Sequence, residues 1–177
     1  MVDLAEIQFA YYMLAATGVL VAAIYYIISL RYNMKAREME IFRLVTSDFS
    51  SEQGIQRYAT MMNMEWKDYE DFMEKYGQSN PEMFGKWVSQ FLGWENMGVL
   101  IKSKVVTAER IYITGGIGPI LAWEKFKDVI QRRRDVTWGR DYLSNAEFLA
   151  QEMLKIKIRN DPGFKDKLET YRRTWKP

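Results

Sequence analysis

The feature that most constrains this chain is a run of 24 residues without a charged side chain, from Ile7 to Leu30. As an α-helix, at about 1.5 Å per residue, the run would be about 36 Å long, which exceeds the roughly 30 Å of bilayer hydrocarbon. Ten of its residues are Leu, Ile, Val or Phe, and together they favour membrane insertion by roughly 3–6 kcal/mol. The run therefore predicts a transmembrane helix.

Two other interpretations of this run are weaker. A cleaved signal peptide needs a basic start and a shorter apolar core, but the first six residues contain Asp3 and Glu6 and no Lys or Arg. A core helix of a soluble protein rarely has 18 or more uncharged apolar residues in succession. We interpret residues 1–32 as an uncleaved membrane anchor.

The charges on either side of the run predict its orientation. No Lys or Arg precedes it, whereas Arg31, Lys35, Arg37 and Arg43 follow it. By the positive-inside rule, the N-terminus lies outside and the rest of the chain lies in the cytoplasm, as in a single-pass protein of the cell membrane.

Small residues recur along part of the predicted span. Ala15, Gly18 and Ala22 are separated by three and four positions, so they share one side of a helix. Such a surface allows the backbone of a second transmembrane helix to approach closely. These three residues are candidates for helix packing with another membrane protein subunit.

The 177 residues include no cysteine and no histidine. This composition excludes disulfides, thiolate metal sites and thiol nucleophiles. It also excludes a Ser-His-Asp triad and imidazole metal ligands. Carboxylate, lysine or tyrosine chemistry and methionine-only metal binding remain open, and we expect no cofactor.

Beyond the span, helical periodicity and helix-end signals predict an all-α fold. Ser51 and Asn80-Pro81 are typical of helix starts, and the segment GGIGP at 115–119 is typical of a break between helices. Ser144 and Glu147 have the spacing of a capping box. The sequence predicts that the membrane helix runs on into a cytoplasmic bundle of about six helices at 33–160, followed by a basic amphipathic tail at 161–177.

Two groups of side chains have the composition of metal sites. The acidic group could hold a cation, but its acids lie beside the apolar positions of a helix, which favours a solvated face. The methionine group offers soft sulfur ligands for Cu(I), although methionines next to a tryptophan are more often part of a core. The acidic group is Glu65, Asp68, Glu70, Asp71 and Glu74, and the methionine group is Met61, Met62 and Met64.

Charge is unevenly distributed along the chain. Residues 38–95 carry a net charge of −6, and residues 96–177 carry +7. Anionic lipid attracts basic residues near a membrane by about 1 kcal/mol each, and an acidic protein partner is the other candidate. No nucleic-acid-binding module is recognisable. The candidate contact residues are Arg132, Arg133, Arg134, Arg172 and Arg173.

One segment resembles a known family. Residues 83–134 combine an aromatic helix, a basic loop, a short helix and a Trp-Glu helix that leads to three arginines; the matching positions are Phe91, Gly98, Leu100, Trp123, Glu124 and Arg132 to Arg134. This order is similar to that of an uncharacterised family of bacterial and archaeal single-span membrane proteins with a helical cytoplasmic domain. The GGIG residues before Pro119 depart from the pattern. The resemblance implies a fold and a membrane topology and no activity.

These features together favour a non-catalytic, single-pass accessory or scaffolding subunit of a larger membrane protein complex. A copper-containing membrane monooxygenase is one example of such a complex. The alternative is a membrane-tethered adaptor whose basic surface binds anionic lipid or an acidic partner. An enzyme that uses a carboxylate or a tyrosine is a third hypothesis.

Overall fold

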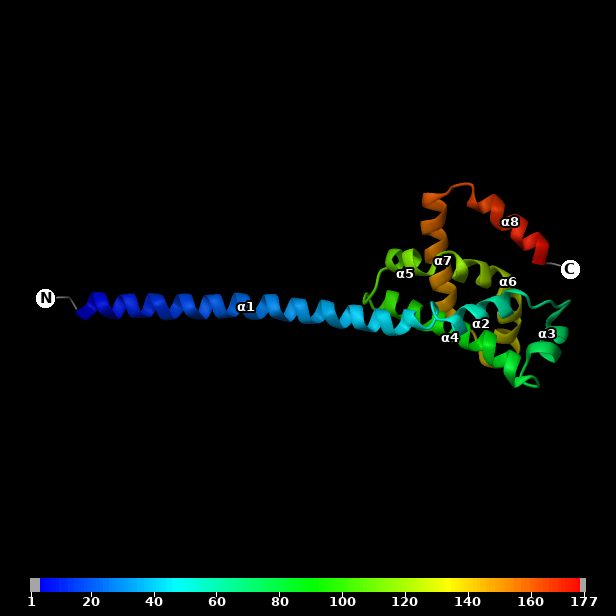
Figure 1. Ribbon diagram of the computed structural model, residues 1–177, viewed down its shortest axis with the longest axis horizontal. Coiled ribbons are helices and arrows are strands. Elements are labelled where there is room, and N and C mark those ends of the chain that lie inside the picture. The colour runs from blue at the N-terminus through cyan, green and yellow to red at the C-terminus, as the bar shows by residue number, and fades with distance from the viewer. Residues whose placement is uncertain (1–3, 176–177) are drawn as a thin grey trace. The chain divides into compact units, whose positions relative to one another are not determined.

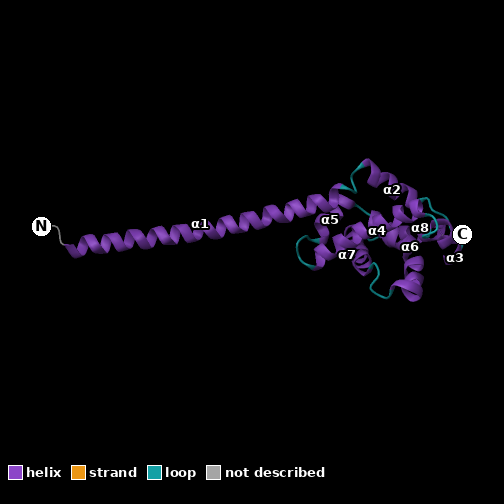
Figure 2. Cartoon of the chain, turned by 90° about the horizontal axis from the view of Figure 1, so that it is seen from below, coloured by secondary structure: helices purple, strands orange, loops and turns teal. Residues whose placement is uncertain are grey.

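The computed structural model describes residues 4–175, apart from the side chain of Val45. Helices and loops account for all of these residues, with no strand among them (Figure 2), so the all-α prediction is confirmed. The elements, in chain order, are α1 (Leu4–Ser47), α2 (Glu52–Met62), α3 (Tyr69–Tyr76), α4 (Pro81–Lys102), α5 (Ala108–Gly115), α6 (Gly118–Arg133), the π-helix η1 (Arg134–Trp138), α7 (Ser144–Asn160) and α8 (Phe164–Trp175).

The chain divides into two compact units, Met1–Ile41 and Phe42–Pro177. From Leu4 onward, the first unit is part of α1. This helix is long and apolar enough between Leu4 and Leu44 to cross a membrane, and none of its most apolar window is buried inside the protein. No helix break follows residue 32, because α1 continues to Ser47. The second unit has a core of its own, and we call it the helical domain.

Local sequence signals set most helix ends in the helical domain. The Ser51 side chain accepts a hydrogen bond from the Gly54 N–H at 3.0 Å and caps α2. The Asn80 side chain likewise accepts from the Met83 N–H at 3.3 Å at the start of α4. Gly116 ends α5 with a positive φ of 60°, a conformation that glycine adopts without strain. These three predicted boundaries are confirmed.

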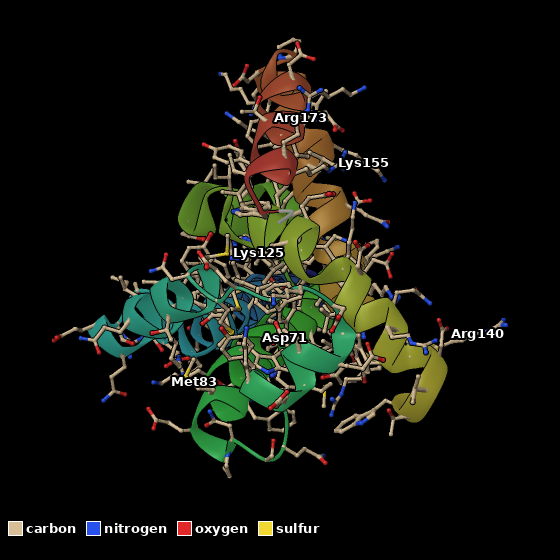
Figure 3. The ribbon with its side chains drawn as sticks, turned by 90° about the vertical axis from the view of Figure 1, so that its right-hand side faces the viewer. Asp71, Met83, Lys125, Arg140, Lys155 and Arg173 are labelled. Carbon is tan, nitrogen blue, oxygen red and sulfur yellow. The ribbon has the colours of Figure 1, made fainter. Side chains whose placement is uncertain are left out.

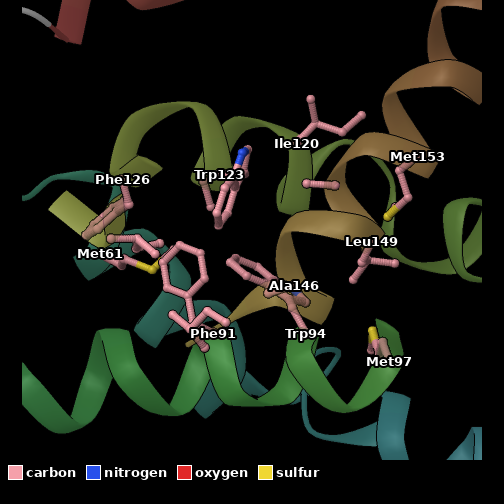
Figure 4. Packing of buried hydrophobic residues seen from close by; sticks show 14 of the residues in the cluster. Met61, Phe91, Trp94, Met97, Ile120, Trp123, Phe126, Ala146, Leu149 and Met153 are labelled. Carbon is pink, nitrogen blue, oxygen red and sulfur yellow. The ribbon is translucent and has the colours of Figure 1, made fainter. Parts of the chain in front are cut away.

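The core of the helical domain is built around α4, which packs against α2, α3 and α7. In the ribbon, α7 crosses α4 (Figure 1). Phe91 and Trp94 on α4 point toward Trp123 and Phe126 on α6 (Figure 4). The ring of Phe126 on α6 meets Phe91 edge-on at 5.5 Å and stacks with Trp87 at 6.3 Å, both on α4. Such ring contacts add about 0.5–1.5 kcal/mol per pair to the burial of apolar area, so they hold α6 against α4.

The C-terminal segment is part of this core. Phe164 and Leu168 on α8 are buried in the same hydrophobic cluster as the side chains of α4 and α6. A separate tail was predicted at 161–177. Its described part, up to residue 175, contains helix α8, which packs on the helical domain. Six α-helices, α2 to α7, lie in the predicted range 33–160, as expected, and α8 follows them as a seventh.

Helix α7 begins differently from the predicted capping box. Leu143 occupies the N-cap position in the left-handed conformation, and no side chain of the helix's own first turn caps it. Instead, Glu95 on α4 accepts hydrogen bonds from the Ala146 N–H at 2.7 Å and from Asn145 Nδ2 at 2.6 Å. A carboxylate at a helix N-terminus is favourable because it meets unpaired N–H groups and the positive end of the helix dipole.

Replacing Glu95 with alanine should lower the free energy of unfolding by about 2 kcal/mol, because the Ala146 N–H loses a charged acceptor. Glu95→Gln keeps an acceptor and should lose about half as much. Urea unfolding followed by tryptophan fluorescence measures both changes. Equal stability of the alanine variant and the unmodified protein would show that Glu95 does not cap α7.

Candidate functional site

A cleft of the helical domain lies between α6, α8 and the loop that joins α2 to α3. Its volume is about 810 Å³. Arg173 on α8 and Lys125 on α6, two residues of this cleft, are labelled in Figure 3. We call it the polar cleft, and its lining residues are Trp66, Lys67, Asp68, Tyr69, Glu124, Lys125, Lys127, Asp128, Val129, Glu169, Arg172, Arg173 and Trp175.

Glu124 joins two walls of the polar cleft. Its Oε2 accepts hydrogen bonds from Lys127 Nζ at 2.8 Å and from Arg172 Nε at 2.7 Å, and its side chain is only 9% exposed. Burial by itself raises the pKa of Glu124, but the hydrogen bonds from Arg172 and Lys127 outweigh it, so the pKa is lowered from its ordinary value of 4.5. The ionised carboxylate therefore holds α8 against α6.

This lowered pKa predicts a pH-dependent contribution to stability. The contribution of the Glu124 carboxylate should be complete above about pH 4.5 and should be lost as the pH falls through the lower pKa of the folded protein. Glu124→Gln should therefore cost about 1–2 kcal/mol at pH 7 and clearly less below pH 4. Unfolding free energies of both proteins across this range give the difference. A difference that stays constant with pH would contradict the ion pair.

Lys125 forms part of the cleft wall in a partly buried position. Its Nζ donates a hydrogen bond to the Met62 carbonyl at 2.6 Å and lies 5.4 Å from the centroid of the Trp66 ring. Burial lowers the pKa of Lys125 from 10.5. A lowered pKa is one property of a nucleophilic lysine, but this ammonium is bound to a carbonyl and an aromatic face. The contacts indicate that Lys125 ties α6 to the end of α2.

Arg173 on α8 is one of the cations of the polar cleft. Its side chain is exposed, and it forms no ion pair with any residue in the described range 4–175. Arg172 differs, because it is bound to Glu124 and Glu169. Arg172 and Arg173 were both predicted to contact lipid or a partner. Arg172 instead holds the wall of the cleft together through its ion pairs, whereas the charge of Arg173 is accessible to a bound partner.

The three consecutive arginines do not form one surface cluster. Only Arg132 is exposed. Arg133 is 2% exposed, and its guanidinium lies over the rings of Phe84, Trp87 and Trp138 at 4.9–6.0 Å. The structure therefore removes Arg133 from the predicted contact surface, because the aromatic rings that surround it exclude solvent.

Arg134 is occupied within the domain as well. Its Nε donates to the Tyr142 carbonyl at 2.7 Å, and its Nη1 forms an ion pair with Glu147 at 2.8 Å. Its side chain is 8% exposed. These bonds join η1 to the start of α7, so Arg134 acts in folding, and Arg132 is the member of the triplet that a lipid or a partner can reach.

The two predicted metal groups have structural roles in the described chain. Asp68 caps α3 by accepting from the Asp71 N–H at 2.8 Å, and Asp71 is paired with Lys75 at 2.8 Å. Residues 4–175 contain no cluster of three acids placed to hold a metal ion. Met61 and Met64 are buried in the hydrophobic core, as expected for methionines that fill a core.

The predicted packing residues of the span, Ala15, Gly18 and Ala22, are all exposed on α1. A Cβ atom added at Gly18 would meet nothing within 4 Å. Ile7 and Leu30, the ends of the predicted run, both lie inside the same unbroken helix. The small-residue surface is therefore open to another helix.

The sequence interpretation missed one polar residue in the core. Gln90 on α4 is 2% exposed, and its Oε1 has no hydrogen-bond partner among the described residues. It shares the buried face of α4 with Trp87, Trp94 and Met97. The sequence did contain a signal for this residue. Trp87, Gln90, Trp94 and Met97 are separated by three, four and three positions, so the Gln90 amide lies within an apolar helix face.

Comparison with known proteins identifies a family. The family described as domain of unknown function DUF4760 matches residues 13–153, about four-fifths of the chain. The chain belongs to this family. The resemblance to an uncharacterised family is thereby confirmed. No curated protein and no solved structure matches the chain. The match ends within α7, so the α8 wall of the polar cleft lies beyond the matched DUF4760 residues.

Proposed function

We propose that this member of the DUF4760 family is a non-catalytic, single-pass protein of the cell membrane that serves as an accessory or scaffolding subunit of a larger membrane complex. In this proposal α1 crosses the bilayer with its N-terminus outside. The helical domain lies in the cytoplasm and binds a partner subunit through the polar cleft.

The observation that carries the proposal is the exposed apolar surface of α1. The helical domain buries its own core of aromatic and aliphatic side chains, whereas none of the most apolar window of α1 is covered by the protein. Large exposed apolar surfaces are unfavourable in water and usually mark contacts with protein or membrane. A bilayer covers such a helix on all sides, and the Ala15, Gly18 and Ala22 side suits a second helix.

The polar cleft supports the choice of a protein partner. Three residues of the cleft, Trp66, Arg173 and Trp175, are of types that are enriched at protein interfaces. An acidic segment of a partner subunit matches this chemistry, because a carboxylate can pair with Arg173 in bidentate geometry. The absence of cysteine and histidine from the chain favours a role without catalysis.

Membrane topology can be tested directly because the chain has no cysteine of its own. Two single variants are needed. Glu6→Cys places a thiol before the predicted span, and Gln78→Cys places a thiol after it. In sealed right-side-out vesicles, a membrane-impermeant maleimide should label the first variant and should label the second only after lysis. Labelling of residue 78 in intact vesicles would contradict the proposed orientation.

A cross-linking experiment tests the partner. Thr174→Cys, an exposed position beside Arg173, should cross-link to a specific membrane subunit when native membranes are treated with a short thiol-to-amine reagent. Gln78→Cys, which is exposed and outside the cleft, serves as the control. Cross-links to lipid amines alone would support the adaptor that binds anionic lipid. Equal products from both variants would contradict a partner at the cleft.

A further inference from the structure

A line of apolar positions follows α1 from the uncharged run into the charged segment after it. From Met13 to Leu44, positions alternately three and four residues apart form the a and d positions of a heptad repeat. A repeat sustained over more than four heptads is typical of a helix that pairs with another helix in a coiled coil. We call this line the seam, and its residues are Met13, Ala16, Leu20, Ala23, Ile27, Leu30, Met34, Arg37, Ile41 and Leu44.

The last part of the seam lies beyond the uncharged run, where polar and apolar side chains can be told apart. Met34, Ile41 and Leu44 on this part are 57%, 40% and 66% exposed. Five of the six charged residues between positions 31 and 44 lie outside the a and d positions, and the exception is Arg37. A line of exposed apolar side chains in a charged segment is typical of an interaction surface, so the seam calls for a partner helix.

Other contacts of α1 use the side of the helix that faces away from the seam. Phe42 is buried in the core of the helical domain and Thr46 is partly buried; they occupy heptad positions b and f. Ala15, Gly18 and Ala22, the predicted packing residues of the span, occupy c, f and c. The b, c and f positions lie on the outside of a coiled coil. Pairing through the seam therefore leaves these other contacts undisturbed.

The charges of the seam select a second copy of the chain as the partner. Arg37 at a d position needs an acid on the facing helix, and the next residue, Glu38, occupies position e; both are exposed. In a parallel pair of helices, a d side chain packs into a hole of the facing helix that includes its e residue. A two-fold pair of this helix therefore places each Arg37 beside the Glu38 of the other copy, so the surface is complementary to itself.

We propose that two copies of this chain pair in parallel through the seam of α1, with Arg37 of each copy bound to Glu38 of the other. The parallel arrangement rests on the membrane topology of the proposed function, because two copies that cross the bilayer in the same direction have parallel helices. The polar cleft takes no part in this pairing, so each copy can still bind a partner subunit there.

Cysteine cross-linking in native membranes tests the seam. The chain has no cysteine of its own, so a single variant can form a disulfide between copies without competition inside the chain. On oxidation with copper phenanthroline, Met34→Cys and Ile41→Cys should form dimers at least about fivefold faster than Ala36→Cys and Arg43→Cys. All four positions are exposed, but only the first two are seam positions, where the Cα atoms of two copies come within the roughly 4.4–6.8 Å that a disulfide spans.

A charge exchange tests the choice of a second copy, with Ile41→Cys as the reporter in every chain. Arg37→Glu brings two acids together across the seam, and Glu38→Arg brings two bases together. Each variant expressed alone should therefore form about tenfold less dimer than the chain with the reporter alone. When both variants are expressed together with different tags, dimers that contain both tags should recover, because opposite charges then face each other at both contacts.

Three results would overturn the proposal. Equal dimer formation from the seam variants and from Ala36→Cys and Arg43→Cys would mean that the copies only collide in the membrane. Seam cysteines that cross-link to a different protein in place of a second copy would mean that another subunit covers the seam. Mixed dimers that stay as rare as those of either variant alone would mean that Arg37 and Glu38 do not meet.

The labelling of residues 6 and 78 in sealed vesicles separates this proposal from the proposed function. The predicted labelling without seam cross-links would refute the pairing of two copies and leave the membrane topology standing. Labelling that contradicts the topology would refute the proposed orientation itself.

Discussion

Gly98→Ala should destabilise the helical domain by about 3 kcal/mol, near the upper end of the cost of overpacking a core. Gly98 lies on α4 where this helix meets the start of α7. A Cβ atom there would lie 2.1 Å from the Asn145 carbonyl oxygen and 2.6 Å from its carbonyl carbon. Both are backbone atoms, and the adjacent Ala146 N–H is held by Glu95, so α7 cannot shift without losing its cap.

The measurement is urea unfolding of the full chain in mild detergent, followed by tryptophan fluorescence. All six tryptophans lie between residues 66 and 175, so the signal reports on the helical domain alone. Gly85→Ala on the same helix is the matched control. It lies in open space, so the substitution should stabilise the domain by about 0.5–1 kcal/mol. Similar stability of the two variants would contradict the contact between α4 and α7.

The double substitution Val19→Arg with Ala23→Arg should prevent stable membrane insertion. Each arginine near the centre of a span costs about 2.5–3.5 kcal/mol, and the apolar residues of the run supply only roughly 3–6 kcal/mol in total. Both positions are exposed on α1, so the change does not disturb packing inside the protein. The fraction of chain that remains in the membrane pellet after alkaline carbonate extraction measures the effect.

Tyr32→Arg with Ala36→Arg is the matched control for this experiment. These two positions have the same spacing, are also exposed on α1, and lie beyond the uncharged run. Two arginines at the predicted cytoplasmic end should leave insertion intact. Suppose that the Val19 and Ala23 double variant stays in the membrane pellet after carbonate extraction to the same extent as the unmodified chain. That result would mean that the run does not cross the hydrocarbon.

Sequence signals predicted features that depend on neighbouring residues. Ser51 and Asn80 mark helix starts because their side chains bond to an N–H three residues later. Gly116 marks a helix end because few other residues adopt its positive φ. The apolar run likewise needs only its own composition to predict the long helix α1.

Features that join distant parts of the chain were not predictable in this way. Glu95 caps α7 across about 50 residues, so the local capping-box pattern at Ser144 gave the wrong cap. Arg133 looked like one of three surface charges, because only the folded domain brings Phe84 and Trp138 around it. The polar cleft needs α8 to pack beside α6, which no spacing in the sequence encodes.

The central proposal, that the protein is one subunit of a membrane complex bound through the polar cleft, is tested most directly by native mass measurement after gentle extraction from native membranes. The account predicts a species heavier than the 21.0 kDa chain that contains a specific second protein, whose identity would also show whether the complex is a copper monooxygenase. Arg173→Glu should release that protein, and Arg140→Glu, exposed but outside the cleft, should retain it. A stable monomer of 21.0 kDa without a co-purifying subunit would contradict the account.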